Sequence, residues 1–213
     1  MVQTTLSRVS AGFLARRGFL AGLCAATLTA WMPSAASADA NAAQFLDSYA
    51  TKAVDMLGDP STPEATRVNN FEILLTEGFD INTISRFILG RYWRGATAEE
   101  REEFIKVFSR VLAERYAPIF EGADRSRFSV GGAQPIKGKD NLYMVDATVI
   151  SDDGTPIMLR WRIAQRSAGY QILDVMVEGV SMVITLRDEY GSVIRQEGVT
   201  GLIDRLRKTL KTA

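Results

Sequence analysis

The chain has 213 residues, 46% of them hydrophobic, and its 25 basic and 25 acidic side chains give a formal net charge of zero. This length suits one domain with a sizeable core, and the lack of a basic excess argues against nucleic acid as a partner. The sequence contains no histidine and a single cysteine, Cys24. Catalysis by a histidine base, a histidine metal site and an internal disulfide are therefore excluded.

The first forty residues are typical of a bacterial export signal. The pair Arg16 and Arg17 precedes an uncharged apolar run over residues 18–32, which is short for a membrane span. Paired arginines suit either a twin-arginine signal or an ordinary Sec signal, and both routes stay open. Small residues predict cleavage after Ala40, with Ala38 as the second choice, and the mature protein is expected outside the inner membrane.

Between residues 41 and 120, apolar residues recur every three or four positions, which predicts helices. Asp80 is placed to cap one of these helices and Gly90 to end it. Thr97 and Glu100 have the spacing of a capping box at the start of the next helix. The expected helices cover residues 41–57, 63–78, 81–89 and 98–120.

From residue 128 onward, apolar and polar residues alternate, which predicts β-strands. Asp152, Asp153 and Gly154 form a strong hairpin signal between two of them. After the last strand, Gly198 is expected to separate two helices. The expected strands begin at residue 128 and then cover residues 141–150, 156–165 and 170–178, and the helices cover residues 181–196 and 199–210.

This order of elements predicts an α+β fold, in which a curved four-stranded antiparallel sheet packs on helices at both ends of the chain. The expected organisation is a cleaved signal over residues 1–40 and a single domain over residues 41–213. Within that domain, residues 41–120 are expected to be helical, residues 128–178 to form the sheet and residues 181–210 to form the C-terminal helices.

Two stretches resemble the MlaC family, also known from toluene tolerance. They read FDINTISRFILGRYWRGATAEEREEFIKVFSRVLAERY and LDVMVEGVSMVITLRDEYGSVIRQEGVTGLIDRLRKTL, and the LGRYWR and VEGVSM segments within them are the most specific. The resemblance implies a nuclear-transport-factor-two-like fold with a pocket between sheet and helices that holds phospholipid acyl chains.

The same resemblance implies a periplasmic carrier that maintains the lipid asymmetry of the outer membrane. Its expected partners are an outer-membrane lipoprotein–porin complex and an inner-membrane ABC transporter complex with MCE domains. Phospholipid is the expected cargo, no cofactor is expected, and the carrier is expected to be a monomer.

The resemblance and the apolar faces together give a set of candidate lipid contacts. Val180, Met182 and Val183 are the strongest candidates, because they lie at the junction between the last strand and the following helix. Candidates on the helices, such as Phe108 and Leu112, also suit an ordinary core. The full set is Ile84, Phe87, Ile88, Tyr92, Phe108, Leu112, Val145, Val149, Leu159, Trp161, Ile163, Val175, Val177, Val180, Met182 and Val183.

Three alternatives stay open. Small isomerases and dehydratases of this fold type use buried carboxylates, and only Asp146 and Asp174 are candidates for a general base. Strand alternation places both on the solvent-facing side of the sheet, with Leu173, Val175 and Val177 on the other side, which argues against catalysis. A carrier of hopanoid-related lipids and a protein-binding subunit without a ligand are the other two alternatives.

Overall fold

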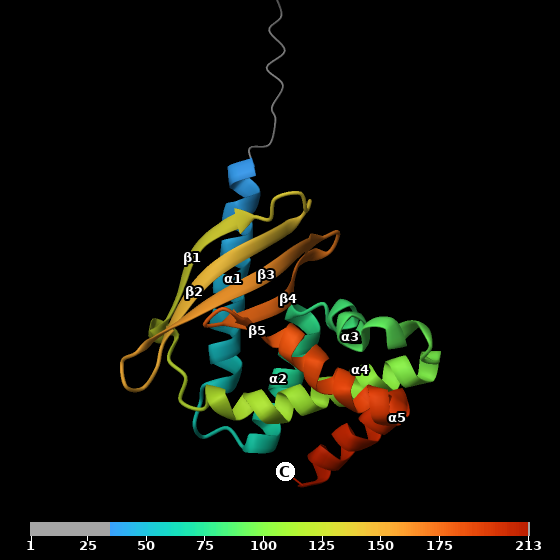
Figure 1. The fold of residues 1–213 in the computed structure, drawn as a ribbon. Coiled ribbons are helices and arrows are strands. Elements are labelled where there is room, and N and C mark those ends of the chain that lie inside the picture. The colour runs from blue at the N-terminus through green and yellow to red at the C-terminus, as the bar shows by residue number, and fades with distance from the viewer. Residues whose placement is uncertain (1–34, 213) are drawn as a thin grey trace, which may run out of the picture. The chain divides into compact units, whose positions relative to one another are not determined.

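The computed structural model describes the backbone of residues 35–212 and the side chains of residues 40–210. Helices come first, then an antiparallel sheet, then a long C-terminal helix (Figure 1). The elements before the sheet are α1 (Ala35–Leu57), α2 (Glu64–Gly78), α3 (Ile81–Leu89), η1 (Gly90–Arg94), α4 (Ala98–Tyr116), η2 (Ala117–Phe120) and η3 (Arg125–Arg127). The sheet consists of β1 (Phe128–Pro135), β2 (Leu142–Ile150), β3 (Pro156–Arg166), β4 (Gly169–Val177) and β5 (Val180–Ser181), and α5 (Met182–Thr212) follows.

Short local signals fix the ends of α3 and the start of α4. The Asp80 carboxylate accepts a hydrogen bond from the Thr83 amide at 3.0 Å, which satisfies a free N–H at the start of α3. Gly90 ends this helix with a φ of 54°, a conformation that favours glycine. Thr97 and Glu100 form the reciprocal hydrogen bonds of a capping box. These three predictions are confirmed.

Other helix boundaries differ from the predicted ones. The first helix begins at Ala35, earlier than the predicted residue 41. α4 ends at Tyr116 and continues as the 3₁₀ helix η2, because Pro118 has no N–H to extend the α-helical ladder. Within α5, Gly198 has a φ of 73° and breaks the helix in two, as predicted.

The sheet has five antiparallel strands in the order β1-β2-β3-β4-β5, one more than predicted. The additional strand is short: Gly179, with a φ of 81°, turns the chain back so that only Val180 and Ser181 pair with β4. Two residues are too few to show an alternating pattern, so the sequence could not reveal this strand.

One face of the sheet, here called the inner face, carries the predicted apolar residues of β2 and β3. Trp161 on this face pairs with Val175, whereas Ile163 pairs with Ile172, so a bulge shifts the register within β4. A bulge places an extra residue in one strand and changes which side chains share a face. Ile172 therefore takes the inner-face position predicted for Leu173, and that prediction is wrong.

Phe79, the residue before the Asp80 cap of α3, packs against two large apolar cores. We call the first the sheet cluster: it lies where α1 crosses β1 and β2 (Figure 1) and contains Ala42, Leu46, Tyr143, Val145, Ala147, Ile163 and Ile172. We call the second the helical cluster. It lies among α2, α3, α4 and α5 and contains Leu75, Ile81, Ile84, Ile88, Leu89, Phe104, Val107, Phe108, Val111, Leu112, Leu186, Tyr190, Ile194, Leu202, Ile203 and Leu206.

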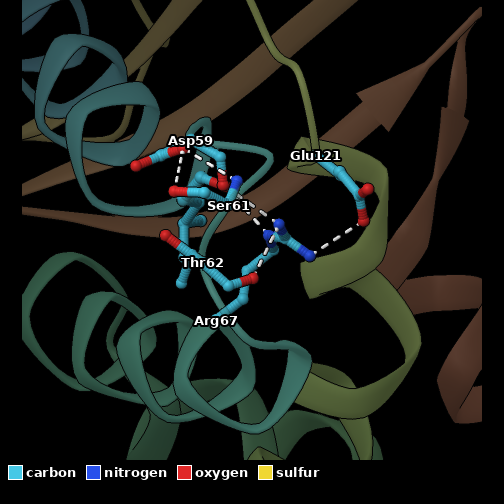
Figure 2. A network of polar contacts seen from close by, with 6 residues as sticks. Asp59, Ser61, Thr62, Arg67 and Glu121 are labelled. Carbon is cyan, nitrogen blue, oxygen red and sulfur yellow. Dashed lines mark hydrogen bonds and ion pairs between the residues drawn. The ribbon is translucent and has the colours of Figure 1, made fainter.

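A buried arginine fixes the turn between α1 and α2 (Figure 2). Arg67 is 2% exposed, and its guanidinium donates to the carbonyls of Leu57 (3.0 Å), Asp59 (3.1 Å) and Thr62 (3.1 Å) and to the Glu121 carboxylate (2.9 Å). A buried cation needs such partners, because an unpaired charge in the interior is strongly destabilising. The network joins the end of α1 to the segment after η2.

None of the helices among the described residues combines the length and the apolarity needed to cross a membrane. The expected export signal lies mostly outside the described residues, and its last positions, residues 35–40, form the start of α1. Cleavage after Ala40 or Ala38 and the division into signal and domain stay predictions.

Candidate functional site

The first group of predicted lipid contacts lies on the inner face of the sheet. Val145 and Ile163 are fully buried members of the sheet cluster. Leu159, Trp161 and Val175 pack against this cluster but remain partly exposed. The inner face is therefore fully covered at Val145 and Ile163 and only partly covered at Leu159, Trp161 and Val175.

Trp161 adds a polar atom to this apolar surface. Its indole Nε1 is buried and has no hydrogen-bond partner among the described residues. Buried donors usually find an acceptor, since leaving one unpaired is destabilising. The partly covered inner face thus contains a free donor.

The second group of predicted contacts belongs to the helical cluster. The Phe104 and Phe108 rings stack with centroids 5.4 Å apart, and the Tyr190 ring meets both at nearly right angles. Phe104 and Phe108 are fully buried and Tyr190 is 4% exposed, and such interlocking rings are typical of a fixed core. Among the predicted contacts, Ile84, Ile88, Phe108 and Leu112 are buried here, and Tyr92 and Val183 pack at the edge.

Phe79 packs against both clusters, although it is not among the predicted lipid contacts. Its ring centroid lies 6.5 Å from that of Trp161 on β3 and 6.1 Å from that of Tyr49 on α1. A sequence signal was available: an apolar residue directly before a helix cap often packs on the first turns of that helix, as a hydrophobic staple. Phe79 precedes the Asp80 cap in this way, and it marks the boundary between sheet and helices.

Tyr49 holds α1 against α2 at this boundary. Its hydroxyl donates to the Leu74 carbonyl at 2.9 Å. Burial, with a further contribution from the Glu77 charge, raises the pKa of Tyr49, so the hydroxyl stays protonated and can donate. The ring lies over Gly78, where an added Cβ would be 2.2 Å from Tyr49 Cε2. Only glycine leaves room for this contact.

The remaining predicted contacts are more exposed. Val149 and Val177 are partly buried, and so is Met182 at the start of α5. Phe87 is 40% exposed and Val180 is 54% exposed, and neither belongs to the sheet or the helical cluster. Val180 therefore lies at the surface of the junction between β4 and α5.

Asp174 connects that junction to the sheet, contrary to its predicted exposure. It is only 2% exposed, because β5 and the start of α5 cover it. Its carboxylate accepts hydrogen bonds from the Ser181 hydroxyl (2.6 Å) and the Val183 amide (3.2 Å), and Arg162 lies 3.8 Å away. Both carboxylate oxygens are thus engaged in holding the start of α5 on β4.

The other candidate base, Asp146, lies on the outer face as predicted. It pairs with Arg160 at 2.6 Å, and both side chains are substantially exposed. Neither carboxylate faces the partly covered inner face. The described arrangement around these two residues therefore favours structural roles for both.

Comparison with known proteins shows which proteins the chain is similar to. A curated relative, the intermembrane phospholipid transport system binding protein MlaC of Haemophilus influenzae, is 24% identical over 125 residues, which is 57% of this chain and 58% of the relative. The match thus spans less than two thirds of that protein.

A solved structure shares the fold. It is the phospholipid-binding protein from Ralstonia solanacearum in complex with a phospholipid, with a TM-score of 0.68 and 20% identity over 79% of this chain and 96% of that chain. The protein-family model described as MlaC protein matches residues 47–208, which is most of the sequence. The chain therefore belongs to the MlaC family.

Proposed function

We propose that this protein binds a phospholipid in the periplasm and carries it between the two membranes. The acyl chains lie against the partly covered inner face, between the sheet cluster and the helical cluster. The single observation that carries this proposal is the set of partly exposed apolar residues Leu159, Trp161 and Val175 on that face, in a chain of the MlaC family.

The size of the apolar surface required follows from the cargo. Removing a methylene group from water is worth about 0.8 kcal/mol, so two long acyl chains correspond to roughly 20 kcal/mol in total. A carrier must replace that contact with apolar side chains for the whole of its transit. A long, continuous apolar face with few buried charges supports this role better than it supports catalysis.

Exchange with membrane complexes belongs to the same proposal. An outer-membrane lipoprotein–porin complex and an inner-membrane ABC transporter complex with MCE domains would load and unload the carrier. Because the carrier has no energy source of its own, the difference in lipid affinity between these partners would decide the outcome of each exchange.

Native mass spectrometry of the mature protein, purified from a periplasmic extract and followed by lipid extraction, tests the proposal. We expect a bound mass of phospholipid that is released on denaturation. A hopanoid mass would keep the carrier and change its lipid class. A protein without any lipid would contradict the proposal.

Val180→Glu tests the role of the junction in the same experiment. Val180 is exposed, so the substitution should fold normally but place a charge where the chains enter. Ile119→Glu is the matched control, since Ile119 is 71% exposed on η2 and belongs to neither cluster. We expect lipid loss in the first variant only, and equal lipid in both would exclude Val180 from the site.

A further inference from the structure

Two buried side-chain polar atoms of the described residues lack a hydrogen-bond partner, the indole Nε1 of Trp161 and the hydroxyl oxygen of Ser85. Of these, Trp161 lies on the partly covered inner face. An indole N–H can donate a hydrogen bond but cannot accept one, so only an acceptor can satisfy it. An unsatisfied donor lowers stability, and its presence on this surface suggests a contact that forms with a ligand.

The neighbours of Trp161 within the sheet offer no acceptor. Trp161 pairs with Val145 on β2 and with Val175 on β4. Leu159 and Ile163 lie two residues away on β3 and therefore share its face. A water molecule needs two to four polar partners, which these apolar side chains do not supply. The acceptor for the indole N–H is therefore expected to come from a ligand.

The charges around the inner face restrict the kind of acceptor. The inner-face residues of β2 and β3 are all uncharged. The arginines on either side of Trp161 in the chain belong to the outer face, where Arg160 pairs with Asp146 at 2.6 Å and Arg162 lies 3.8 Å from Asp174. A phosphate on the inner face would be an unpaired charge among apolar side chains, which is strongly destabilising. The surroundings therefore favour an uncharged acceptor.

The ester groups of a phospholipid meet this requirement. Each ester joins an acyl chain to the glycerol backbone, and its carbonyl oxygen is an uncharged acceptor at the polar end of the chain. A carbonyl that leaves water needs a new donor, just as the buried indole needs an acceptor. One hydrogen bond would satisfy both groups without burying a charge.

The position of Trp161 along β3 suits this contact. Val177 pairs with Leu159 on one side and with the exposed Val180 on the other. Trp161 lies two residues beyond Leu159 on β3, a distance of about 7 Å. A phosphate group at the exposed junction would therefore place the glycerol backbone and its ester groups near Trp161.

We propose that Trp161 donates its indole N–H to an ester carbonyl of the carried phospholipid. The Phe79 ring, which is partly exposed, packs against both clusters with its centroid 6.5 Å from that of Trp161. Acyl chains that enter between the clusters separate Phe79 from the inner face, and the carbonyl then reaches the indole. The inference rests on the proposed carrier function, and it adds selectivity for ester-linked chains.

A lipid-loading competition tests the hydrogen bond. The delipidated protein is incubated with vesicles that contain equal parts of two phosphatidylglycerols, one with ester-linked and one with ether-linked chains of the same length. The protein is re-isolated and its lipids are quantified by mass spectrometry. We expect the ratio of ester to ether lipid to be about two- to tenfold higher in the wild type than in Trp161→Phe, which is the usual effect of one hydrogen bond. The total load should stay similar, because phenylalanine keeps an apolar ring on the face.

Two variants control for effects unrelated to this bond. Trp93→Phe makes the same chemical change in a tryptophan that packs on the helical cluster. Ser85→Ala removes the other buried polar atom without a partner, which belongs to α3. Both variants should keep the wild-type ratio of ester to ether lipid. Equal ratios in the wild type and in folded Trp161→Phe would overturn the inference.

Nuclear magnetic resonance of the indole tests the bond without altering Trp161. In a protein of residues 41–213 with Trp93→Phe, Trp161 supplies the only indole N–H. Because a hydrogen bond moves an indole proton to lower field, we expect its resonance at lower field with the ester lipid bound than with the ether lipid bound. The same position with both lipids would contradict the inference. A protein that loads neither lipid would contradict the carrier function itself, which is a separate failure.

Discussion

The helical cluster and the inner face of the sheet are both apolar, but they are covered to different degrees. Phe104 and Phe108 are fully buried and stacked, whereas Leu159, Trp161 and Val175 remain partly exposed. A fixed core has no room for a ligand without loss of its own contacts. The comparison indicates that the helical cluster stabilises the fold, and it supports the proposal that the acyl chains lie against the inner face.

The largest expected effect is on the helical cluster. Phe108→Ala should lower the free energy of unfolding by about 3–5 kcal/mol, because it leaves a cavity in a closely packed core. Chemical denaturation measures this loss. The folded fraction should still bind one lipid per protein, and a folded variant without lipid would show that Phe108 contacts the cargo instead.

The contact between α1 and α2 should be the next most sensitive. Gly78→Ala forces a Cβ into the Tyr49 ring and should lower the free energy of unfolding by about 1–3 kcal/mol. In a Tyr49→Leu background the same substitution should be less harmful, because the two residues are in direct contact. Additive losses in this double-mutant cycle would contradict the contact.

The junction should depend on its buried carboxylate. Asp174→Ala leaves the Ser181 hydroxyl and the Val183 amide without an acceptor and should lower the free energy of unfolding by about 1–3 kcal/mol. Asp146→Ala is the control on the outer face, where a change within about 0.5 kcal/mol is expected. Equal losses in the two variants would leave no special role for Asp174.

The smallest expected effect is the pH dependence of the α3 cap. Burial alone would raise the pKa of Asp80, but hydrogen bonds from Thr83 and Arg166 outweigh burial and lower the pKa below its usual range. The cap therefore contributes stability that is fully present above about pH 4 and is lost as the pH falls through the lower, folded-state pKa.

Asp80→Asn should remove this dependence. Denaturation of the wild-type protein and of the Asp80→Asn variant gives the free energy of unfolding of each at pH 7 and pH 3. The wild-type value should exceed that of the variant by less than about 1 kcal/mol at pH 7, and by a smaller amount at pH 3. A difference that grows toward pH 3 would contradict a lowered pKa.

Local signals predicted most of the fold. Asp80, Gly90, Thr97 and Gly198 act within one or two helical turns, so the sequence contains all the information needed to place them. The β5 strand and the β4 bulge depend instead on pairing between strands, which no local pattern encodes.

The site was harder to predict for the same reason. Alternation placed Asp174 on the polar face correctly, but its burial comes from β5 and α5, which fold back over that face. Phe79 and Tyr49 are far apart in the sequence and meet only when α1 lies on the sheet.

Trp161 offers the most direct test of where the acyl chains lie. A protein that comprises residues 41–213 contains two tryptophans, Trp93 and Trp161, so Trp93→Phe leaves a single fluorophore on the inner face. With a phospholipid brominated along its chains bound one to one, we expect strong quenching of Trp161 relative to the unbrominated lipid. Unquenched Trp161, together with quenched Trp93 in a Trp161→Phe protein, would place the chains at the helical cluster and contradict this account.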